Sequence, residues 1–231
     1  MIGIIDSGMG GLTTLATLVR HRCDNAFCYY ADTASAPYGN KDKGSIIRAT
    51  AQAAKELSKR GADRIVLACN TATVAALPYL QNTLSCPISG VTPPVEEAIQ
   101  AGGSVLVMAT AFTGEYIRKQ YRDVRTVTMP ALATLVDRWY PDNRQVIQGY
   151  LEEKLAHLSN VDNVVLGCTH YILLKEEICR LIRAKRAFDA NDALAVQLQK
   201  RPCTRGVAID IVASGAIDES RYTNVLQHLL D

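Results

Sequence analysis

The chain of 231 residues predicts an α/β fold built from two similar α/β domains with mainly parallel sheets. Three observations support this class. Short apolar runs alternate with longer amphipathic segments, as strands and helices do around parallel sheets. An internal repeat relates the two halves, and a cysteine ends the corresponding strand in each half. Because ligands bind beyond the carboxyl ends of parallel strands, we expect the active site in a cleft between the domains.

The elements are expected in alternating order along the chain. Residues 1–5 form a buried strand, and the next segment places Leu12, Leu15 and Leu18 at helical spacing. Residues 45–60 form an amphipathic helix whose basic C-terminal end suits the negative pole of the helix dipole. Pro87 and the Thr92-Pro93-Pro94 segment mark a non-helical crossover. The other strands are expected at residues 27–30, 64–68, 104–108 and 161–166.

The repeat is visible at two places in the sequence. Residues 64–71 align with residues 163–170, at an offset of 168 − 69 = 99 residues. Residues 2–7 align more loosely with residues 105–110, at an offset of 105 − 2 = 103 residues. The near agreement of the offsets predicts two related halves. If the halves face each other, the two strand-end cysteines lie on opposite walls of one cleft.

The composition excludes several classes of protein. The chain has 25 Lys+Arg and 23 Asp+Glu, a net charge of 25 − 23 = +2, and the charges are interspersed, so we expect no nucleic-acid partner. A hydrophobic content of 48% argues against disorder. No apolar run reaches the roughly 18–20 residues that span a bilayer. The start of the chain also lacks the basic region of a secretory signal, so no membrane association is expected.

Seven cysteines, an odd number, do not suggest a disulfide framework in a chain of this size. Reduced thiols in a cytoplasmic compartment are the better interpretation. No C-x-x-C pair and no histidine at zinc-finger spacing occurs, so no metal site is expected. Five of the seven are interpreted as small buried hydrophobic residues, namely Cys23, Cys28, Cys86, Cys179 and Cys203.

Cys69 and Cys168 have a different context, because each ends an apolar strand and precedes small polar residues. Backbone amides at a strand-to-helix turn can lower the pKa of a thiol. His170 follows Cys168 by two residues and is placed to tune it. The alternative, in which both thiols are strand-end core residues and His170 is an ordinary loop histidine, stays open on this pattern alone.

The loop after the first strand, residues 6–11, carries three glycines, which allow a tight turn and close approach of a ligand to the backbone. It does not fit the G-x-G-x-x-G fingerprint, and no P-loop pattern occurs, so no nucleotide cofactor is expected. Asp6 is a candidate for assisting proton transfer or holding an ammonium group. Alternatively, Asp6 and Ser7 serve turn and cap functions. Tyr38 follows the second strand, where it is either a ligand contact or a surface aromatic.

Taken together, the motifs resemble those of glutamate racemases, in the aspartate/glutamate racemase superfamily. The matching segments occur in the family's order over most of the chain, at residues 4–13, 31–33, 37–39, 68–72, 90–96 and 166–171. The resemblance implies cofactor-independent interconversion of L- and D-glutamate, which supplies D-glutamate for peptidoglycan synthesis and cell-wall biogenesis. It also implies a cytoplasmic homodimer whose partner is the small molecule glutamate.

By this resemblance, Cys69 and Cys168 are the two catalytic acid/base residues, acting on D- and L-glutamate respectively. Asp6 and His170 match groups that assist the adjacent thiols. Two bases are needed because a single base returns the proton to the face from which it came. The positions matching substrate-binding residues are Asp6, Ser7, Tyr38, Gly39, Asn70, Thr71, Thr169 and His170.

The resemblance also implies a domain division. Residues 1–90 plus 189–231 form the N-terminal domain, and residues 91–188 form an inserted second domain, with returning segments at residues 189–193 and 213–215. The chain departs from the family in being some tens of residues shorter. Asp137 stands where many members have Glu, Tyr171-Ile172 replaces an aromatic-Pro step, and Ala109 stands where Gly is common. Two alternatives stay open: a racemase of the same superfamily acting on aspartate or another amino acid, and a non-catalytic regulatory protein on this fold.

Overall fold

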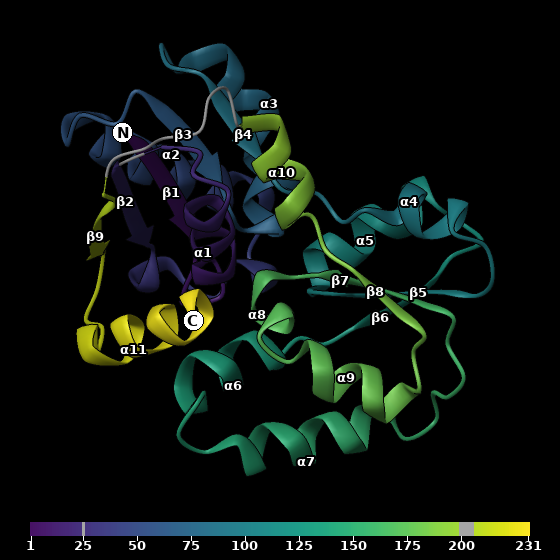
Figure 1. Ribbon diagram of the computed structural model, residues 1–231. Helices are drawn as coiled ribbons and strands as arrows, with labels where there is room; N and C mark the ends of the chain where they lie inside the picture. The colour runs from purple at the N-terminus through teal and green to yellow at the C-terminus, as the bar shows by residue number, and fades with distance from the viewer. Residues whose placement is uncertain (25, 199–205) are drawn as a thin grey trace.

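A computed structural model describes residues 1–24, 26–198 and 206–231. It has two lobes, each built around one sheet (Figure 1). The first sheet has the order β4-β3-β1-β2-β9 and the second β6-β5-β7-β8. In the described chain every strand pair is parallel, as predicted. The strands are β1 (Ile2–Asp6), β2 (Ala26–Ala31), β3 (Arg64–Leu67), β4 (Ile88–Gly90), β5 (Val105–Ala109), β6 (Arg125–Thr128), β7 (Asn163–Gly167), β8 (Arg186–Phe188) and β9 (Ala208–Ala213).

The predicted repeat is confirmed by the strand pairing. The order β4-β3-β1-β2 in the first sheet corresponds to β8-β7-β5-β6 in the second. The registers also agree: Ile5 pairs with Leu67, and Met108, 103 residues after Ile5, pairs with Leu166. The carboxyl ends of β3 and β7 therefore hold equivalent places in their sheets.

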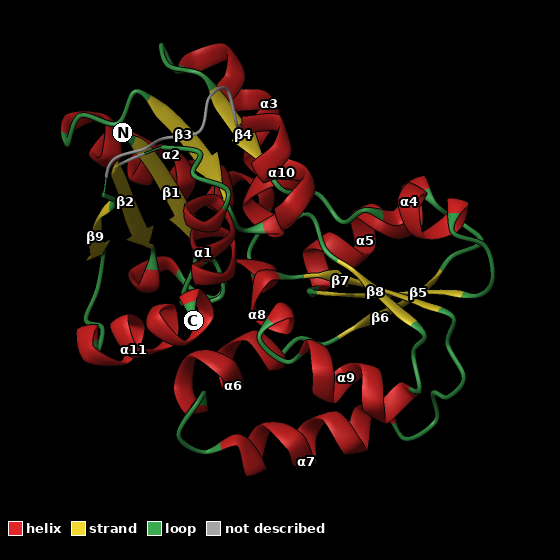
Figure 2. Ribbon diagram, viewed as in Figure 1, coloured by secondary structure: helices red, strands yellow, loops and turns green. Residues whose placement is uncertain are grey.

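Helices cover both faces of the first sheet (Figure 2). Successive side chains of a strand point to opposite faces, so Ile5 and Ile65 join a core with α2 and α3, while Ile4 and Val66 join another with the helices opposite. Asp42 caps α2 by accepting a hydrogen bond from the backbone N–H of Ser45. These helices are α2 (Lys43–Lys59) and α3 (Asn70–Thr83) on one face, and α1 (Leu12–Arg20), α10 (Asn191–Leu198) and α11 (Glu219–Leu230) on the other.

The second sheet is covered in the same way, and one of its faces shares its core with the first sheet. Val107 and Val165 pack with α4 and α5, whereas Leu106 and Val164 belong to the apolar cluster that also contains Ile4 of β1. A continuous core therefore joins the lobes. The helices here are α4 (Val95–Gln100), α5 (Ala111–Gln120), α6 (Leu132–Trp139), α7 (Arg144–Leu155), α8 (Thr169–Ile172) and α9 (Lys175–Ile182).

The predicted elements are confirmed with shifts of one or two residues at most ends. The crossover near residue 90 is non-helical, as predicted, and it also contains a short strand that the sequence did not predict, because residues 88–90 pair with β3 as strand β4. The chain then enters the second lobe through residues 91–94 and leaves it after β8, and β9 pairs with β2 of the first sheet. The domain boundaries at residues 90 and 189 stay a prediction.

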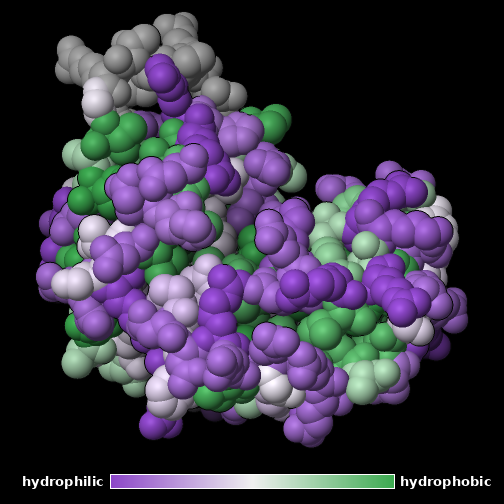
Figure 3. Space-filling model, turned by 60° about the horizontal axis from the view of Figure 1, so that its bottom comes forward, coloured by the Kyte–Doolittle hydropathy of each residue, from purple (hydrophilic) through white to green (hydrophobic). Residues whose placement is uncertain are grey.

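None of the helices described combines the length and apolar character needed to cross a bilayer. Hydrophilic residues cover most of the face shown in Figure 3, with hydrophobic residues in separate groups between them. The same view shows a hollow between the two lobes.

Candidate functional site

Both strand-end thiols line one small cavity where the two sheets' carboxyl ends meet. Cys69 follows β3 and stands at the N-cap of α3, and Cys168 follows β7 and stands at the N-cap of α8. The cavity has a volume of about 20 Å³, room for about one water molecule. The thiols are buried, with 7% and 6% of their surface exposed. The equivalent places of β3 and β7 thus bring together residues that lie 99 positions apart.

Eight of the ten predicted site residues line this cavity, and two stand behind its wall. The lining residues among them are Ser7, Tyr38, Gly39, Cys69, Asn70, Thr71, Cys168 and His170. Asp6 and Thr169 do not line it. They are buried and bonded to each other, with the Thr169 hydroxyl donating to Asp6 Oδ2 over 3.1 Å. Direct contact of these two with a substrate stays a prediction.

The environment of Cys69 favours the neutral thiol. Burial raises its pKa far above the ordinary value, and the Asp6 carboxylate raises it further. The backbone amides of Ala72 and Thr71, in the first turn of α3, act in the opposite direction. Burial also raises the pKa of Asp6, although His170 and the Gly8 N–H lower it. Asp6 and Cys69 are therefore two acidic groups close enough to influence each other's protonation.

Cys168 stands at the end of a chain of polar contacts. Its Sγ lies 3.8 Å from His170 Nδ1, and His170 Nε2 lies 3.0 Å from Asp137 Oδ1. The backbone N–H of Met9 donates to the same Asp137 oxygen over 2.9 Å. His170 is 2% exposed, whereas the Asp137 side chain is 29% exposed. A carboxylate, an imidazole and a thiol in this order can support proton transfer at sulfur.

The imidazole and the carboxylate of this chain shift each other's pKa. Burial alone lowers the pKa of His170, but the charge and hydrogen bond of Asp137, together with the contact with Cys168, outweigh burial and raise this pKa well above the usual value. Burial alone raises the pKa of Asp137, and the His170 charge and hydrogen bond together with the Met9 N–H lower it. Both shifts favour an imidazolium bonded to a carboxylate.

The glycines of the β1–α1 loop make room for this chain of contacts. A Cβ atom on Gly8 would lie 2.3 Å from Asp137 Oδ2, and one on Gly10 would lie 2.4 Å from His170 Nδ1. The backbone nitrogen of Gly10 also lies 3.4 Å from His170 Nε2, so the imidazole ring packs directly on this loop. Asp137 and His170 of the second lobe therefore pack directly on this loop. This packing accounts for the glycines at positions 8 and 10, and no bound nucleotide is needed to explain them.

The alternative that Tyr38 is a surface aromatic is wrong, because only 1% of its surface is exposed. Its hydroxyl donates to Asp32 Oδ2 over 2.5 Å, and the Ser214 hydroxyl donates to Asp32 Oδ1 over 2.6 Å. Burial and the Asp32 charge both raise the pKa of Tyr38. Asp32, after β2, and Ser214, after β9, thereby hold one wall of the cavity in place.

At the start of α3, polar groups point toward the second lobe and the cavity. The Thr71 hydroxyl lies 2.9 Å from the Thr110 hydroxyl and 3.1 Å from that of Thr113, which joins α3 to the start of α5. Asn70 is 4% exposed, lines the cavity and has no hydrogen-bond partner for its Oδ1. A buried carbonyl oxygen without a partner is costly, and here it can accept from a bound donor.

The remaining cysteines agree only partly with the sequence interpretation. Cys28 is buried, and burial with the nearby Asp210 raises its pKa to about 11. Cys23, Cys86 and Cys179 are half-buried, less than the sequence interpretation expects, and each packs at the edge of an apolar cluster. Cys203 lies outside the described residues. Within the described ranges, no group of three His, Cys, Asp or Glu residues could hold a metal ion.

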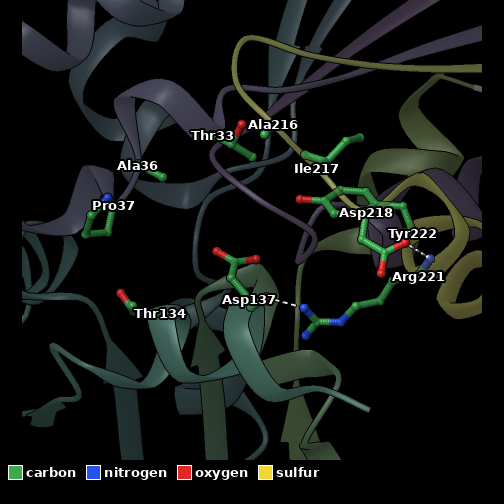
Figure 4. A pocket seen from close by; sticks show the side chains of 10 residues that line it. All are labelled: Thr33, Ala36, Pro37, Thr134, Asp137, Ala216, Ile217, Asp218, Arg221 and Tyr222. Carbon is green, nitrogen blue, oxygen red and sulfur yellow. Dashed lines mark hydrogen bonds between the residues drawn. The ribbon is translucent and has the colours of Figure 1, made fainter. Parts of the chain in front are cut away.

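A second, larger pocket of about 340 Å³ has Asp137 in its wall (Figure 4). Pro37 lines both pockets. Figure 4 shows Asp137 and Thr134 on α6 facing the loop that carries Pro37, with Arg221 on α11 at the end of the pocket.

Sequence reasoning missed several residues at the site. Thr110, Pro130 and Ala133 line the cavity, and Asp137, noted only as a departure from the family, holds His170. Thr110 follows β5 directly, so the rule for carboxyl ends of parallel strands is a signal that would have found it. The other three lie beyond β6 on α6 or before it, where no local pattern marks them.

Comparison with known proteins identifies the family to which this fold and site belong. A profile of the family described as Asp/Glu/Hydantoin racemase matches residues 13–198. The glutamate racemase of Leptospira interrogans is 35% identical over 202 residues, covering 82% of this chain and 78% of that protein.

Two solved structures are similar over nearly the whole chain. The glutamate racemase of Thermus thermophilus, in complex with beta-chloro-D-alanine, has a TM-score of 0.80 at 30% identity, covering 100% of this chain and 93% of that one. That of Campylobacter jejuni has a TM-score of 0.82 at 26% identity, covering 99% and 97%.

Proposed function

The chain belongs to the Asp/Glu/Hydantoin racemase family and has glutamate racemases among its relatives, and on that premise we propose that it interconverts L- and D-glutamate by two-thiol proton transfer. One observation carries the proposal. Cys69 and Cys168 stand at equivalent strand ends of two related sheets and line the same cavity. Racemisation at Cα needs a base on one face of the carbon and an acid on the other, and two thiols that line one cavity support the assignment of these two roles to Cys69 and Cys168.

The chemical step moves one proton off the substrate and another onto it. One thiolate takes the proton from Cα, so that the C–H bond breaks, an S–H bond forms and the electron pair stays on the substrate. The opposite thiol then gives its proton to the other face and becomes a thiolate. No electrons are gained or lost overall, and the two sulfurs exchange protonation states in each turnover. We propose that Cys69 serves D-glutamate and Cys168 serves L-glutamate.

The two thiols receive different assistance in this proposal. Beside Cys69, Asp6 and the α3 amides act on the thiol. Beside Cys168, the His170–Asp137 pair supplies a charged imidazole in contact with sulfur. The neutral state of Cys69 fits its role as the acid when L-glutamate is the substrate. His170, in contact with the Cys168 sulfur, is placed to orient that sulfur when Cys168 acts as the base for the same direction.

The substrate is held by groups around the cavity. The unpartnered Oδ1 of Asn70 can accept a hydrogen bond from the substrate ammonium, and the hydroxyls of Ser7 and Thr71 can donate to its carboxylate. A glutamate molecule is several times larger than water, so it does not fit a cavity of about 20 Å³. We therefore expect the two lobes to move apart when glutamate enters and to close again around it.

We further propose, from the family, that the product D-glutamate serves peptidoglycan synthesis, that the step needs no cofactor, and that the enzyme works as a cytoplasmic homodimer. A second candidate is aspartate racemisation. It is supported by the family match, because the description of that family names Asp beside Glu. A clear preference for aspartate in a panel of amino acids would replace glutamate in the proposal.

The decisive experiment is exchange of the Cα proton in D2O, started separately from each enantiomer. Wild type should convert both enantiomers and place deuterium at Cα. Cys69→Ser and Cys168→Ser should each lose racemisation, because a serine hydroxyl is a far weaker acid than a thiol. Cys179→Ser is the matched control, since this half-buried thiol lies outside the cavity, and it should behave as wild type. Full racemisation by either cavity variant would refute the two-thiol mechanism.

A further inference from the structure

Arg221, in the first turn of α11, binds the end of α6 with its whole guanidinium group. Its Nε donates to the Tyr140 carbonyl over 2.5 Å, one terminal nitrogen to the Asp137 carbonyl over 2.6 Å, and the other to the Val136 carbonyl over 3.1 Å. The side chain is 16% exposed. Figure 4 shows it reaching from α11 to the turn that carries Asp137.

We propose that Arg221 is a positioning residue that sets the place of the Asp137 carboxylate, and through it the orientation of His170 at Cys168. This inference rests on the proposed function and deepens it. It joins the last helix of the chain, which packs on the first sheet, to the thiol of the second lobe.

The end of a helix is where such a contact has the greatest effect. The Val136 carbonyl accepts the last backbone hydrogen bond of α6, from the Tyr140 N–H, and the Asp137 and Tyr140 carbonyls lie beyond it. Carbonyls at this end carry the negative end of the helix dipole. A guanidinium is planar and always charged, so it can hold several of these oxygens in a fixed geometry. Because α6 has only eight residues and ends at Trp139, fixing its last turn fixes Asp137.

Asp137 is linked to the sulfur of Cys168 through His170. The carboxylate lies 3.0 Å from His170 Nε2, and His170 Nδ1 lies 3.8 Å from Cys168 Sγ. Met9 holds the same carboxylate oxygen from the first lobe. Arg221 and Met9 therefore fix the backbone and the side chain of Asp137 from the first lobe's elements, so its position depends on how the lobes meet.

Arg221 also lines the larger pocket, but its hydrogen bonds do not indicate that it binds a ligand there. The three guanidinium nitrogens already donate to carbonyls, and a weaker ion pair joins Arg221 to Asp142 at 3.8 Å. Asp218, which also lines the pocket, accepts from the backbone N–H of Arg221 as the cap of α11. All three nitrogens of the guanidinium are therefore used in hydrogen bonds within the protein.

The first test needs no substrate. An imidazolium bonded to a carboxylate in a buried site gives a proton resonance far downfield, which Asp137→Asn should abolish and so assign to His170. Arg221→Met should weaken or remove this resonance at neutral pH. Arg20→Met is the matched control, because Arg20 also binds α11, at the Leu229 carbonyl over 2.7 Å, without touching α6. It should keep the resonance.

The second test uses glutamate deuterated at Cα. Arg221→Met should lower kcat/KM about 10- to 100-fold, the scale of a small misplacement of a reacting group. The loss should fall on the Cys168 step alone. The isotope effect on kcat/KM should therefore rise with deuterated L-glutamate and fall with deuterated D-glutamate. Arg221→Lys keeps the charge but cannot reach three carbonyls at once, so its effects should be intermediate, and it replaces Arg221→Met if that variant does not fold.

Two outcomes would overturn the inference. One is a downfield resonance that is absent from wild type or unchanged in both Arg221 variants. The other is a loss of activity with both isotope effects unchanged, as a purely structural role predicts. If wild type fails to racemise glutamate, the proposed function is refuted, and the resonance still decides the role of Arg221.

Discussion

Substitution of Gly10 by alanine tests whether His170 packs directly on the loop between β1 and α1. A Cβ atom on Gly10 would lie 2.5 Å from the backbone nitrogen of His170, where ordinary contacts begin at 3.4 Å, a shortfall of 3.4 − 2.5 = 0.9 Å. The backbone cannot rotate away as a flexible side chain can. Overpacking of this kind costs about 1–3 kcal/mol, and the gain from a stiffer unfolded chain offsets about 0.4–1 kcal/mol of it.

We therefore expect Gly10→Ala to lower the free energy of unfolding by about 1–2 kcal/mol in a urea titration followed by circular dichroism. Glutamate turnover should fall on the order of 100-fold, because a displacement near 1 Å moves His170 away from Cys168. Gly149→Ala is the control. A Cβ there meets nothing within 4 Å, and Gly149 lies inside α7, so the protein should gain roughly 0.5–1 kcal/mol with unchanged turnover. Wild-type stability and turnover in Gly10→Ala would refute the docking of the second lobe on this loop.

Two further predictions concern the pair at Cys168 and the amide at Cys69. Since the folded pKa of His170 is raised, the ion pair with Asp137 stabilises the fold fully below the unfolded pKa of about 6.5 and loses this effect as pH rises through the folded pKa. In Asp137→Asn, burial becomes the dominant influence on the pKa of His170 and lowers it, so the free energy of unfolding in urea titrations should instead rise with pH between about pH 5 and 8. A wild-type pH dependence in this variant would contradict the pairing of His170 with Asp137. Asn70→Ala removes a buried carbonyl without a partner, so it should leave the melting temperature within a few degrees of wild type and raise the KM for glutamate about tenfold; an unchanged KM would exclude Asn70 from substrate binding.

The parallel sheets could be predicted because buried strands are apolar on both faces and alternate with amphipathic helices. The offsets of 99 and 103 residues reappear in the strand registers, where Ile5 pairs with Leu67 and Met108 with Leu166. The place of the thiols followed from the same rule, since Cys69 and Cys168 come directly after such strands.

What the sequence alone determined is therefore which residues come at the carboxyl ends of the strands. Only the tertiary structure decided what meets them there. His170 rests on Gly10 at a separation of 160 residues, and Arg221 binds the Asp137 carbonyl at a separation of 84. Such contacts depend on how two separately formed sheets pack together. A local pattern of polar and apolar residues records which face of an element is buried, and it does not record which distant side chain covers that face.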